Sequence, residues 1–396
     1  MAHKLASRAL NVTPSVTLSI DAKAKQMVSQ GIDVVGFGVG EPDFDTPVNI
    51  ADAGVNAIRK GFTRYTPANG TVELRQAICA KLKQDNGLEY GPNDIVVSNG
   101  AKHSIYNVLL ALIDDGDEVM ILAPYWVSYT EMVKMVGGVP VVIEASEADD
   151  FKVSLAQLEA ARTEKTKLLF LNSPSNPTGM VYSCEELKTI ADFCVKHGIY
   201  VMADEIYEKL VYDGAEHVSI ASFGPEITDL TIVVNGMSKA YAMTGWRIGY
   251  TACATEMAKA MSSLQSHATS GPNAIAQKAS VEALKGPQDT IDMMVTEFSR
   301  RRLRMVELIN EIPGLSCRTP NGAFYVMANV SGLFGKTLDG EVIKDDVHLA
   351  TVLLEKAHVA VVPGSAFGSG DFVRLSYATS MEQIEEGLKR IKSFVS

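Results

Sequence analysis

The sequence predicts an α/β fold, in which a largely parallel sheet is covered by helices and followed by a smaller α+β region. Short β-rich runs alternate with helical patterns between residues 90 and 255, and several runs are apolar almost throughout, as strands buried on both faces are. Beyond residue 285 the alternation gives way to one long amphipathic pattern. The chain of 396 residues is also longer than one hydrophobic core usually supports, so we expect two domains.

Seven apolar runs are the strand candidates of the predicted sheet, namely residues 95–97, 119–122, 139–143, 168–171, 200–203, 231–234 and 248–251. Helical signals lie between them. The clearest begins at Ser183, which is followed by Glu186 and then by apolar residues on one face, the pattern of a capping box and an amphipathic helix. This βα alternation predicts parallel strands joined by covering helices.

The region beyond residue 285 predicts a second, smaller α+β domain. A long amphipathic helix is expected over residues 289–312, where Pro313 and Gly314 end it. Strand candidates follow at 323–328, 359–362 and 374–376, and a last helix at 381–394. The N-terminal segment is punctuated by proline and glycine and is expected to pack with this region. We therefore predict a large domain over residues 45–285 and a small domain formed by residues 1–44 and 286–396.

Composition and charge argue against several classes of function. The formal net charge of −11 disfavours a nucleic acid as the main partner. The five cysteines are irregularly spaced without a CxxC pair, and no histidine lies at metal-ligand spacing, so we expect reduced thiols, a cytoplasmic location and no metal. No apolar run follows the N-terminal charges or reaches the length of a membrane span, so neither a signal peptide nor a membrane partner is expected.

Ser238 and Lys239 follow the apolar run 231–234, and Arg247 comes eight residues later among small and apolar residues. A lone lysine after a strand is most often a solvated surface charge. A buried lysine, in contrast, has a lowered pKa and can attack a carbonyl group. The guanidinium of Arg247 can hold a phosphate by two parallel hydrogen bonds. Ser238 could donate its hydroxyl to the same phosphate, or it could be a small residue in a turn.

Other candidates also follow predicted strands. Gly100 lies in a turn that opens a helix, where free N–H groups can bind a phosphate, although such glycines often serve geometry alone. Asp204 ends the strand 200–203, at the edge where ligands bind in α/β sheets, or it caps a helix. Asn176 and Pro177 lie in a loop that the proline makes rigid. Trp126 belongs to an aromatic run, which is more often core than a binding surface.

The run at 238–250, SKAYAMTGWRIGY, together with these motifs, resembles the fold-type I aminotransferases of class I, and within them the bacterial aspartate aminotransferases. The resemblance extends over residues 14–380. It implies a large domain with a mostly parallel seven-stranded sheet between helices, plus a smaller α+β domain. It also implies pyridoxal 5'-phosphate as cofactor, small amino and oxo acids as substrates, and a homodimer with shared active sites.

The resemblance implies a role for each cofactor-binding residue. Lys239 carries the cofactor and then acts as the base, and Asp204 pairs with the pyridine nitrogen. Tyr207 and Asn176 donate to the phenolic oxygen, while Trp126 stacks on the ring. The phosphate is bound by Gly100, Ala101, Lys102, Ser238 and Arg247. Tyr65 reaches the phosphate of the other subunit, and Ser270 enters the partner's site likewise.

The resemblance also implies the substrate contacts of an aspartate aminotransferase, which passes an amino group from L-aspartate to 2-oxoglutarate in two half-reactions. Arg374 binds the α-carboxylate bidentately, unless it is a surface arginine on an edge strand. Lys102 binds the distal carboxylate, unless it is a solvated lysine. Trp126 and Asn176 also face the substrate. Further contacts come from Ser15, Thr17 and the backbone of Gly40.

Several alternatives stay open at this stage. One is an aminotransferase with a broader, aromatic or prephenate range, although Thr13 stands where prephenate-accepting relatives tend to carry a basic residue. Another is a carbon–sulfur lyase on the same fold. A cofactor-binding regulator would need an appended DNA-binding segment, and none is visible. A nicotinamide-binding protein is disfavoured because the glycines at 36–40 do not continue into GxGxxG.

Overall fold

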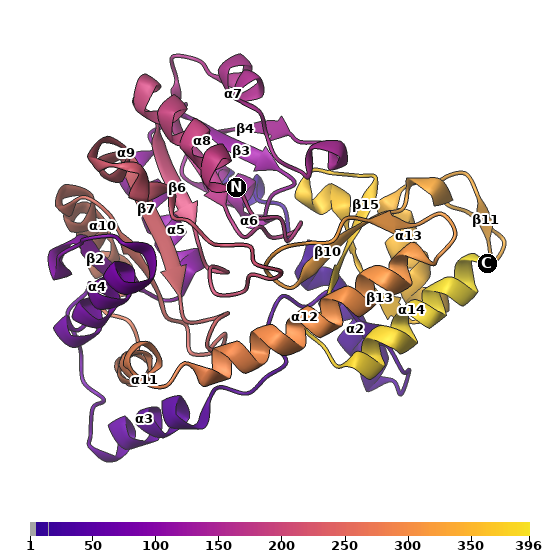
Figure 1. Cartoon of the computed structure of the whole chain (residues 1–396), viewed down its shortest axis with the longest axis horizontal. Helices are drawn as coiled ribbons and strands as arrows, with labels where there is room; N and C mark the ends of the chain where they lie inside the picture. Colours follow the sequence, from indigo (N-terminus) through magenta and orange to yellow (C-terminus); the bar gives the residue numbers. More distant parts are fainter. Residues whose placement is uncertain (1–4, 15) are drawn as a thin grey trace, which may run out of the picture.

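The computed structural model describes residues 5–14 and 16–396, and a seven-stranded sheet forms its centre (Figure 1). In spatial order, the strands are β2 (Ile95–Ser98), β8 (Gly249–Ala252), β7 (Thr231–Gly236), β6 (Tyr200–Asp204), β5 (Thr166–Asn172), β3 (Glu118–Ala123) and β4 (Val139–Glu144). β8 runs antiparallel to both of its neighbours, and all other pairs are parallel. All seven predicted strands are confirmed. The register pairs Asn172 with Asp204 at the carboxyl ends of β5 and β6.

Helices cover both faces of this sheet because neighbouring strand residues point to opposite sides. Along β6, Met202 packs with α5 (Ala101–Leu112), α6 (Ser128–Met135) and α10 (Thr255–Ala268). Val201 packs on the other face with α7 (Leu155–Ala161), α8 (Cys184–His197) and α9 (Pro225–Leu230). A third cluster joins α4 (Val72–Asn86) and α11 (Ala274–Lys285) to β2 and β8. The predicted capping box of Ser183 and Glu186 begins α8.

A second, four-stranded antiparallel sheet is formed by β14 (Val362–Pro363), β15 (Phe372–Ser376), β10 (Tyr325–Asn329) and β9 (Ser316–Cys317). The long helix α12 (Asp289–Asn310) connects the two sheet regions (Figure 1). The predicted strand at 359–362 is instead two short strands, because Val361 separates β13 (Val359–Ala360) from β14, and the two belong to different sheets. The remaining elements here are α13 (Asp346–Val352), α14 (Met381–Val395), β11 (Thr337–Leu338) and β12 (Glu341–Val342).

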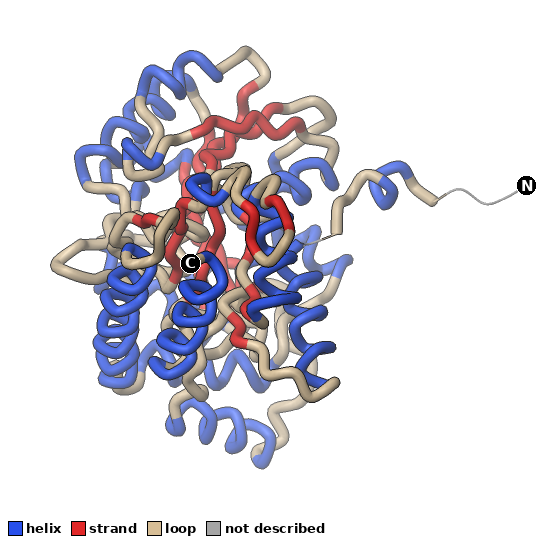
Figure 2. The backbone as a smooth tube through the Cα atoms, turned by 90° about the vertical axis from the view of Figure 1, so that its right-hand side faces the viewer, coloured by secondary structure: helices blue, strands red, loops and turns tan. Residues whose placement is uncertain are grey.

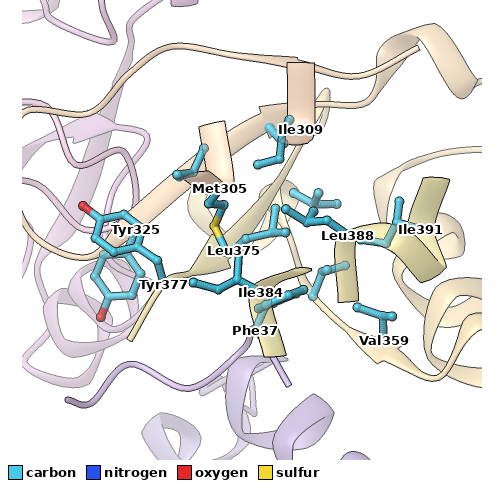
Figure 3. Close-up of a cluster of buried hydrophobic side chains, with 14 of the residues drawn as sticks. Phe37, Met305, Ile309, Tyr325, Val359, Leu375, Tyr377, Ile384, Leu388 and Ile391 are labelled. Carbon is cyan, nitrogen blue, oxygen red and sulfur yellow. The ribbon is translucent and has the colours of Figure 1, made fainter. Parts of the chain in front are cut away.

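The N-terminal segment packs with the C-terminal region. β1 (Val35–Gly36) pairs in parallel with β13, and Phe37 lies in the same apolar cluster as Met305, Leu375 and Ile384 (Figure 3). The expected association of the two chain ends is therefore confirmed for residues 35–37. The predicted domain bounds, 45–285 against 1–44 with 286–396, stay a prediction.

The remaining N-terminal helices lie at the surface. α1 (Ser7–Leu10) lies at the edge of the molecule next to α6 (Figure 2). α2 (Val16–Ser29) has no buried residue among its described side chains, and α3 (Val48–Arg59) buries one face. Within the described ranges, no helix is both long and apolar enough to cross a membrane.

Candidate active site

A pocket of about 470 Å³ lies between the carboxyl edge of the large sheet and the small sheet. The ends of β5 and β6 and the loop after β7 supply one wall, and β10 and β15 supply the facing wall. The structure brings together twelve of the predicted site residues there, namely Thr17, Gly40, Ala101, Lys102, Trp126, Asn176, Asp204, Tyr207, Ser238, Lys239, Arg247 and Arg374. They come from segments scattered over most of the chain, so the fold alone assembles the pocket.

Lys239 lines the pocket from the loop that follows β7. Its ammonium group donates to the carbonyl oxygen of Gly40. Nζ also lies 5.8 Å from the ring centre of Tyr207 and 5.6 Å from that of Phe324. Burial lowers the pKa of Lys239 to about 8, although the negative charge of Glu41 partly opposes this shift. An amine that is partly neutral near neutral pH can act as a nucleophile or a base.

Asp204 ends β6 and is almost fully buried. Burial raises the pKa of its carboxyl group to about 6, and a hydrogen bond from Tyr129 opposes that rise. The Tyr129 hydroxyl donates to Oδ2 over 2.7 Å. The backbone N–H of Ile206 donates to Oδ1 over 3.3 Å. The carboxylate therefore has donors of its own but no cation within the described salt bridges, and it can accept a further N–H from a ligand.

Tyr129 is a pocket residue that the sequence analysis missed. Its hydroxyl bond to Asp204 shows that it does more than pack. The ring of Tyr129 meets the edge of Trp126 at 5.4 Å and lies 4.4 Å from that of Phe170. The sequence held no clear signal for this role, because Trp126 lies outside α6 and an aromatic residue on a helix is more often core.

The turn before α5 forms a cradle for an anion. Gly100 has a φ of +88°, and a Cβ atom there would collide with the guanidinium of Arg247. Arg247 donates to the carbonyl oxygens of Thr244 at 2.8 Å and Asn99 at 3.4 Å. The first N–H groups of α5 have no partner inside the helix, and with Arg247 and the Ser238 hydroxyl they suit a phosphate group.

Lys102 lies beside this cradle, on the first turn of α5. Its Nζ is 4.7 Å from the ring centre of Trp126. Burial, followed by the charge of Arg247, lowers the pKa of Lys102. A cation held over an aromatic ring and facing a pocket suits a ligand carboxylate.

Arg374 lies on β15 in the opposite wall and is buried. Its guanidinium donates to Oδ1 of Asn176 at 2.9 Å and to the carbonyl oxygen of Gly38 at 2.7 Å. It also stacks on the ring of Tyr325, with its Cζ atom 4.4 Å from the ring centre. The Nε atom is buried without a hydrogen-bond partner, and no carboxylate pairs with Arg374 within residues 5–14 and 16–396. Neutral oxygens alone leave this positive charge available for an anionic ligand.

Tyr325 is a second pocket residue that the sequence analysis placed only within a strand. Its hydroxyl group bonds that of Tyr207 at 2.9 Å, and its ring supports Arg374. A Cβ atom at Gly40 would lie 2.7 Å from the Tyr325 oxygen, so the 38–41 loop approaches this wall closely. Burial raises the pKa of Tyr207 well above its usual value, and the tyrosine therefore keeps its donor proton.

Four of the predicted residues do not line the pocket. Gly100 lies behind Arg247, as described above. Tyr65 is 99% exposed and Ser270 has a φ of +60° in the loop before α11; neither faces the pocket. Ser15 lies outside the described residues.

Comparison with known proteins places this arrangement in context. Residues 32–391 match the family model described as aminotransferase class I and II. The chain is 50% identical over 395 residues to an aspartate aminotransferase of Bacillus sp. (strain YM-2), with 100% of each chain covered. It is 49% identical over 394 residues to a probable aspartate/prephenate aminotransferase of Aquifex aeolicus, covering 99% of this chain and 98% of the relative.

Two solved structures are similar over nearly the whole chain. One is the aspartate aminotransferase from Rhizobium meliloti, with a TM-score of 0.96, 44% identity and coverage of 100% of this chain and 99% of that chain. The other is the aspartate aminotransferase from Thermus thermophilus with maleate, with a TM-score of 0.94, 41% identity and coverage of 99% and 100%. The fold predicted from the sequence is thereby confirmed.

Proposed function

Because this chain belongs to the class I and II aminotransferases, which use pyridoxal 5'-phosphate, we propose that it transfers an amino group from L-aspartate to 2-oxoglutarate, forming oxaloacetate and L-glutamate. One observation carries the substrate assignment. Apart from Lys239, which would bond the cofactor itself, three pocket cations, Lys102, Arg247 and Arg374, have no carboxylate partner among the described salt bridges. One phosphate and the two carboxylates of a dicarboxylic amino acid would match these three charges.

The residues of the pocket fit the cofactor. Arg247, Ser238 and the turn at Gly100 would hold its phosphate. Asp204 would pair with the pyridine nitrogen, and Tyr207 with Asn176 would donate to the phenolic oxygen. Trp126 would lie against the ring, while Lys239 would bond the aldehyde carbon. When bound, the cofactor supplies an electron sink for the negative charge left at the substrate Cα.

The chain's own residues would then orient the substrate and move its proton. Arg374 would bind the α-carboxylate and Lys102 the distal one, with Thr17 and the backbone of Gly40 close by. Two anchors fix the direction of the Cα–H bond. The Lys239 amine would take that proton at Nζ, since a pKa of about 8 leaves neutral amine at neutral pH. Ping-pong kinetics are expected, because the first oxo acid leaves the site before the second oxo acid binds.

We include a homodimer in the proposal. Tyr65 is 99% exposed. In a dimer, Tyr65 of one subunit would be buried against the phosphate site of the other subunit. Exposed apolar residues on nearby elements support an interface, among them Val48, Val55 and Ile58 of α3 and Val72 of α4. The five cysteines are all free, which supports the cytoplasmic location expected from their pattern.

A wider substrate range is a second candidate, favoured by relatives named as aspartate/prephenate aminotransferases. Thr13 stands where prephenate-accepting relatives tend to carry a basic residue. Its backbone N–H donates to Glu131 at 2.8 Å, and its side chain is exposed away from the pocket-lining residues. The experiment below therefore includes prephenate as an amino acceptor.

The test is the absorbance spectrum of the holoenzyme before and after addition of L-aspartate without an oxo acid. We expect the cofactor to pass from its aldehyde to its amine form, with one oxaloacetate released per site. Adding 2-oxoglutarate should restore the first spectrum, and prephenate should restore it much more slowly. An unchanged spectrum with L-aspartate would refute the substrate assignment while leaving the family intact.

A further inference from the structure

In the segment 64–71, the side chain of Tyr65 is exposed, whereas the residues that follow it are hydrogen-bonded to the protein interior. Tyr65 is the most exposed large hydrophobic residue of the described chain, at 99%. Its neighbours are nevertheless bonded to buried side chains of α10 and α11. An exposed aromatic residue on a backbone that is already ordered suits binding, because little conformational entropy is lost when a partner covers it.

Gln277 on α11 bonds this segment at Thr66 and at Thr71. Its side chain is fully buried, and its Oε1 accepts from the backbone N–H of Thr71 at 2.7 Å. Its Nε2 donates to Oγ1 of Thr66 at 3.0 Å and to the carbonyl oxygen of Pro272 at 2.9 Å. One glutamine therefore bonds both ends of the stretch that follows Tyr65.

Gln265 on α10 bonds the middle of the segment, at Ala68, and is also fully buried. Its Nε2 donates to the carbonyl oxygens of Ala68 and Val97. Its Oε1 accepts from Ser98 Oγ at 2.7 Å and from Asn107 Nδ2 at 2.8 Å. Ser98 ends β2 just before the turn at Gly100, so Gln265 bonds the segment and the base of the phosphate cradle at once.

Close packing leaves the segment little room to shift. A Cβ atom at Gly70 would lie 2.7 Å from the side chain of Val97, and Gly70 also has a φ of +91°. A Cβ atom at Gly271 would lie 2.8 Å from the carbonyl oxygens of Thr66 and Pro67. The glutamines thus act on backbone that already fits tightly against β2 and the loop before α11.

We propose that Gln277 and Gln265 are positioning residues that hold Tyr65 in place for the active site of the second subunit. Gln277 acts in trans through Tyr65, because its own bonds reach the 64–71 segment and the neighbouring loop at Pro272 but not the phosphate turn. Gln265 acts in trans through Ala68 and in cis through Ser98. The inference rests on the homodimer and the role of Tyr65 proposed above.

The first test uses homodimeric holoenzyme carrying Gln277→Met, which keeps the side-chain volume and removes all three bonds. We expect the affinity for pyridoxal phosphate, measured by quenching of protein fluorescence, to fall about 3- to 10-fold, the size of one misplaced hydrogen bond. Thr66→Val removes only one acceptor and should show a smaller loss in the same direction, even if Gln277→Met folds poorly. Gln157→Met is the matched control, since Gln157 bonds only Ser154 and the carbonyl oxygen of Glu144 on the distant edge strand β4, and should leave the affinity unchanged.

The second test separates action in trans from action in cis. A hybrid dimer pairs a Gln277→Met subunit with a Lys239→Ala subunit, so that the single working lysine receives Tyr65 from a subunit with an intact Gln277. We expect the working site of this hybrid to regain wild-type affinity for the cofactor and wild-type KM. The hybrid with Gln265→Met should regain it only in part, because its own phosphate turn remains altered.

A control hybrid of Tyr65→Phe with Lys239→Ala distinguishes the possible failures. If this control regains wild-type behaviour but the Gln277→Met hybrid and a hybrid that pairs Thr66→Val with Lys239→Ala do not, the positioning inference is overturned and the shared site stands. If the control itself shows no recovery, Tyr65 does not act across subunits, and both the shared site and the inference are overturned.

Discussion

The two walls of the pocket treat charge in opposite ways. On the wall at the carboxyl edge of the large sheet, the buried acid Asp204 is provided with donors from Tyr129 and Ile206. On the wall of the small sheet, the buried cation Arg374 is bonded only to neutral oxygens and packed against Tyr325. The charge of Asp204 is thus satisfied by its own wall, whereas Arg374 is left as a cation that a ligand must neutralise.

This difference suggests a division of labour. A carboxylate that already accepts two hydrogen bonds has a fixed position, and its negative charge can stabilise positive charge on a bound group. The rigid end of a strand keeps the carboxylate in that position. An unpaired buried cation contributes most to the binding of an anion, because the free-energy cost of removing water from the cation is already included in folding. We therefore expect substitutions of Arg374 to act on the substrate, and substitutions around Asp204 to act on the cofactor.

The largest effect is expected for Arg374→Leu. Removing the buried guanidinium should lower kcat/KM for L-aspartate about 10²- to 10⁴-fold, because a buried charge pair loses about 3–5 kcal/mol when one partner is removed. Steady-state kinetics measure this loss, and cofactor affinity should change little. A comparable loss of cofactor affinity would mean that Arg374 belongs functionally to the other wall.

A smaller and more selective effect is expected for Lys102→Met. The methionine keeps contact with Trp126 but removes the charge proposed for the distal carboxylate. We expect kcat/KM for aspartate to fall roughly 10- to 100-fold, with little change for an aromatic amino acid that lacks a second carboxylate. Equal losses for both substrates would place Lys102 at the cofactor phosphate instead.

The smallest effect is expected for Tyr129→Phe on the large-sheet wall. The lost hydrogen bond stabilises only the charged form of Asp204, so the pKa of this carboxyl should rise from about 6. Near about pH 8 Asp204 is charged in both proteins, and the cofactor affinity of the variant should equal that of the wild type. As the pH drops, the affinity of the variant should become several-fold weaker than that of the wild type. Below about pH 6 Asp204 is protonated in both proteins, so the ratio of the two affinities should become constant.

Tyr125→Phe supplies the control for this titration. Tyr125 lies four residues earlier and packs against Gly368 rather than bonding Asp204, so its affinity should follow the wild-type pH curve. A pH-independent loss in Tyr129→Phe would show that the hydroxyl supports packing alone and does not tune the acid.

Much of the fold was predictable because its signals are local. Buried parallel strands appear as apolar runs such as 168–171 and 200–203, and a capping box marks the start of α8. The strand at 359–362 was wrong as a single unit, since an apolar run does not reveal that its two halves pair with different sheets. Tyr325 was missed as a pocket residue because a buried strand tyrosine looks like core until its neighbours are known.

The sequence by itself determined the order of strands and helices, the family resemblance, and Lys239, Asp204 and Arg247 as candidates, because each follows an apolar run that can be recognised within a few residues. Only the tertiary structure decided that Arg374 bonds Asn176, 198 positions away, without an acidic partner among the described residues. It also decided that Gln277 bonds Thr66, 211 positions away. Periodicity reports which face of an element is buried, but partners distant in sequence meet only when the elements pack.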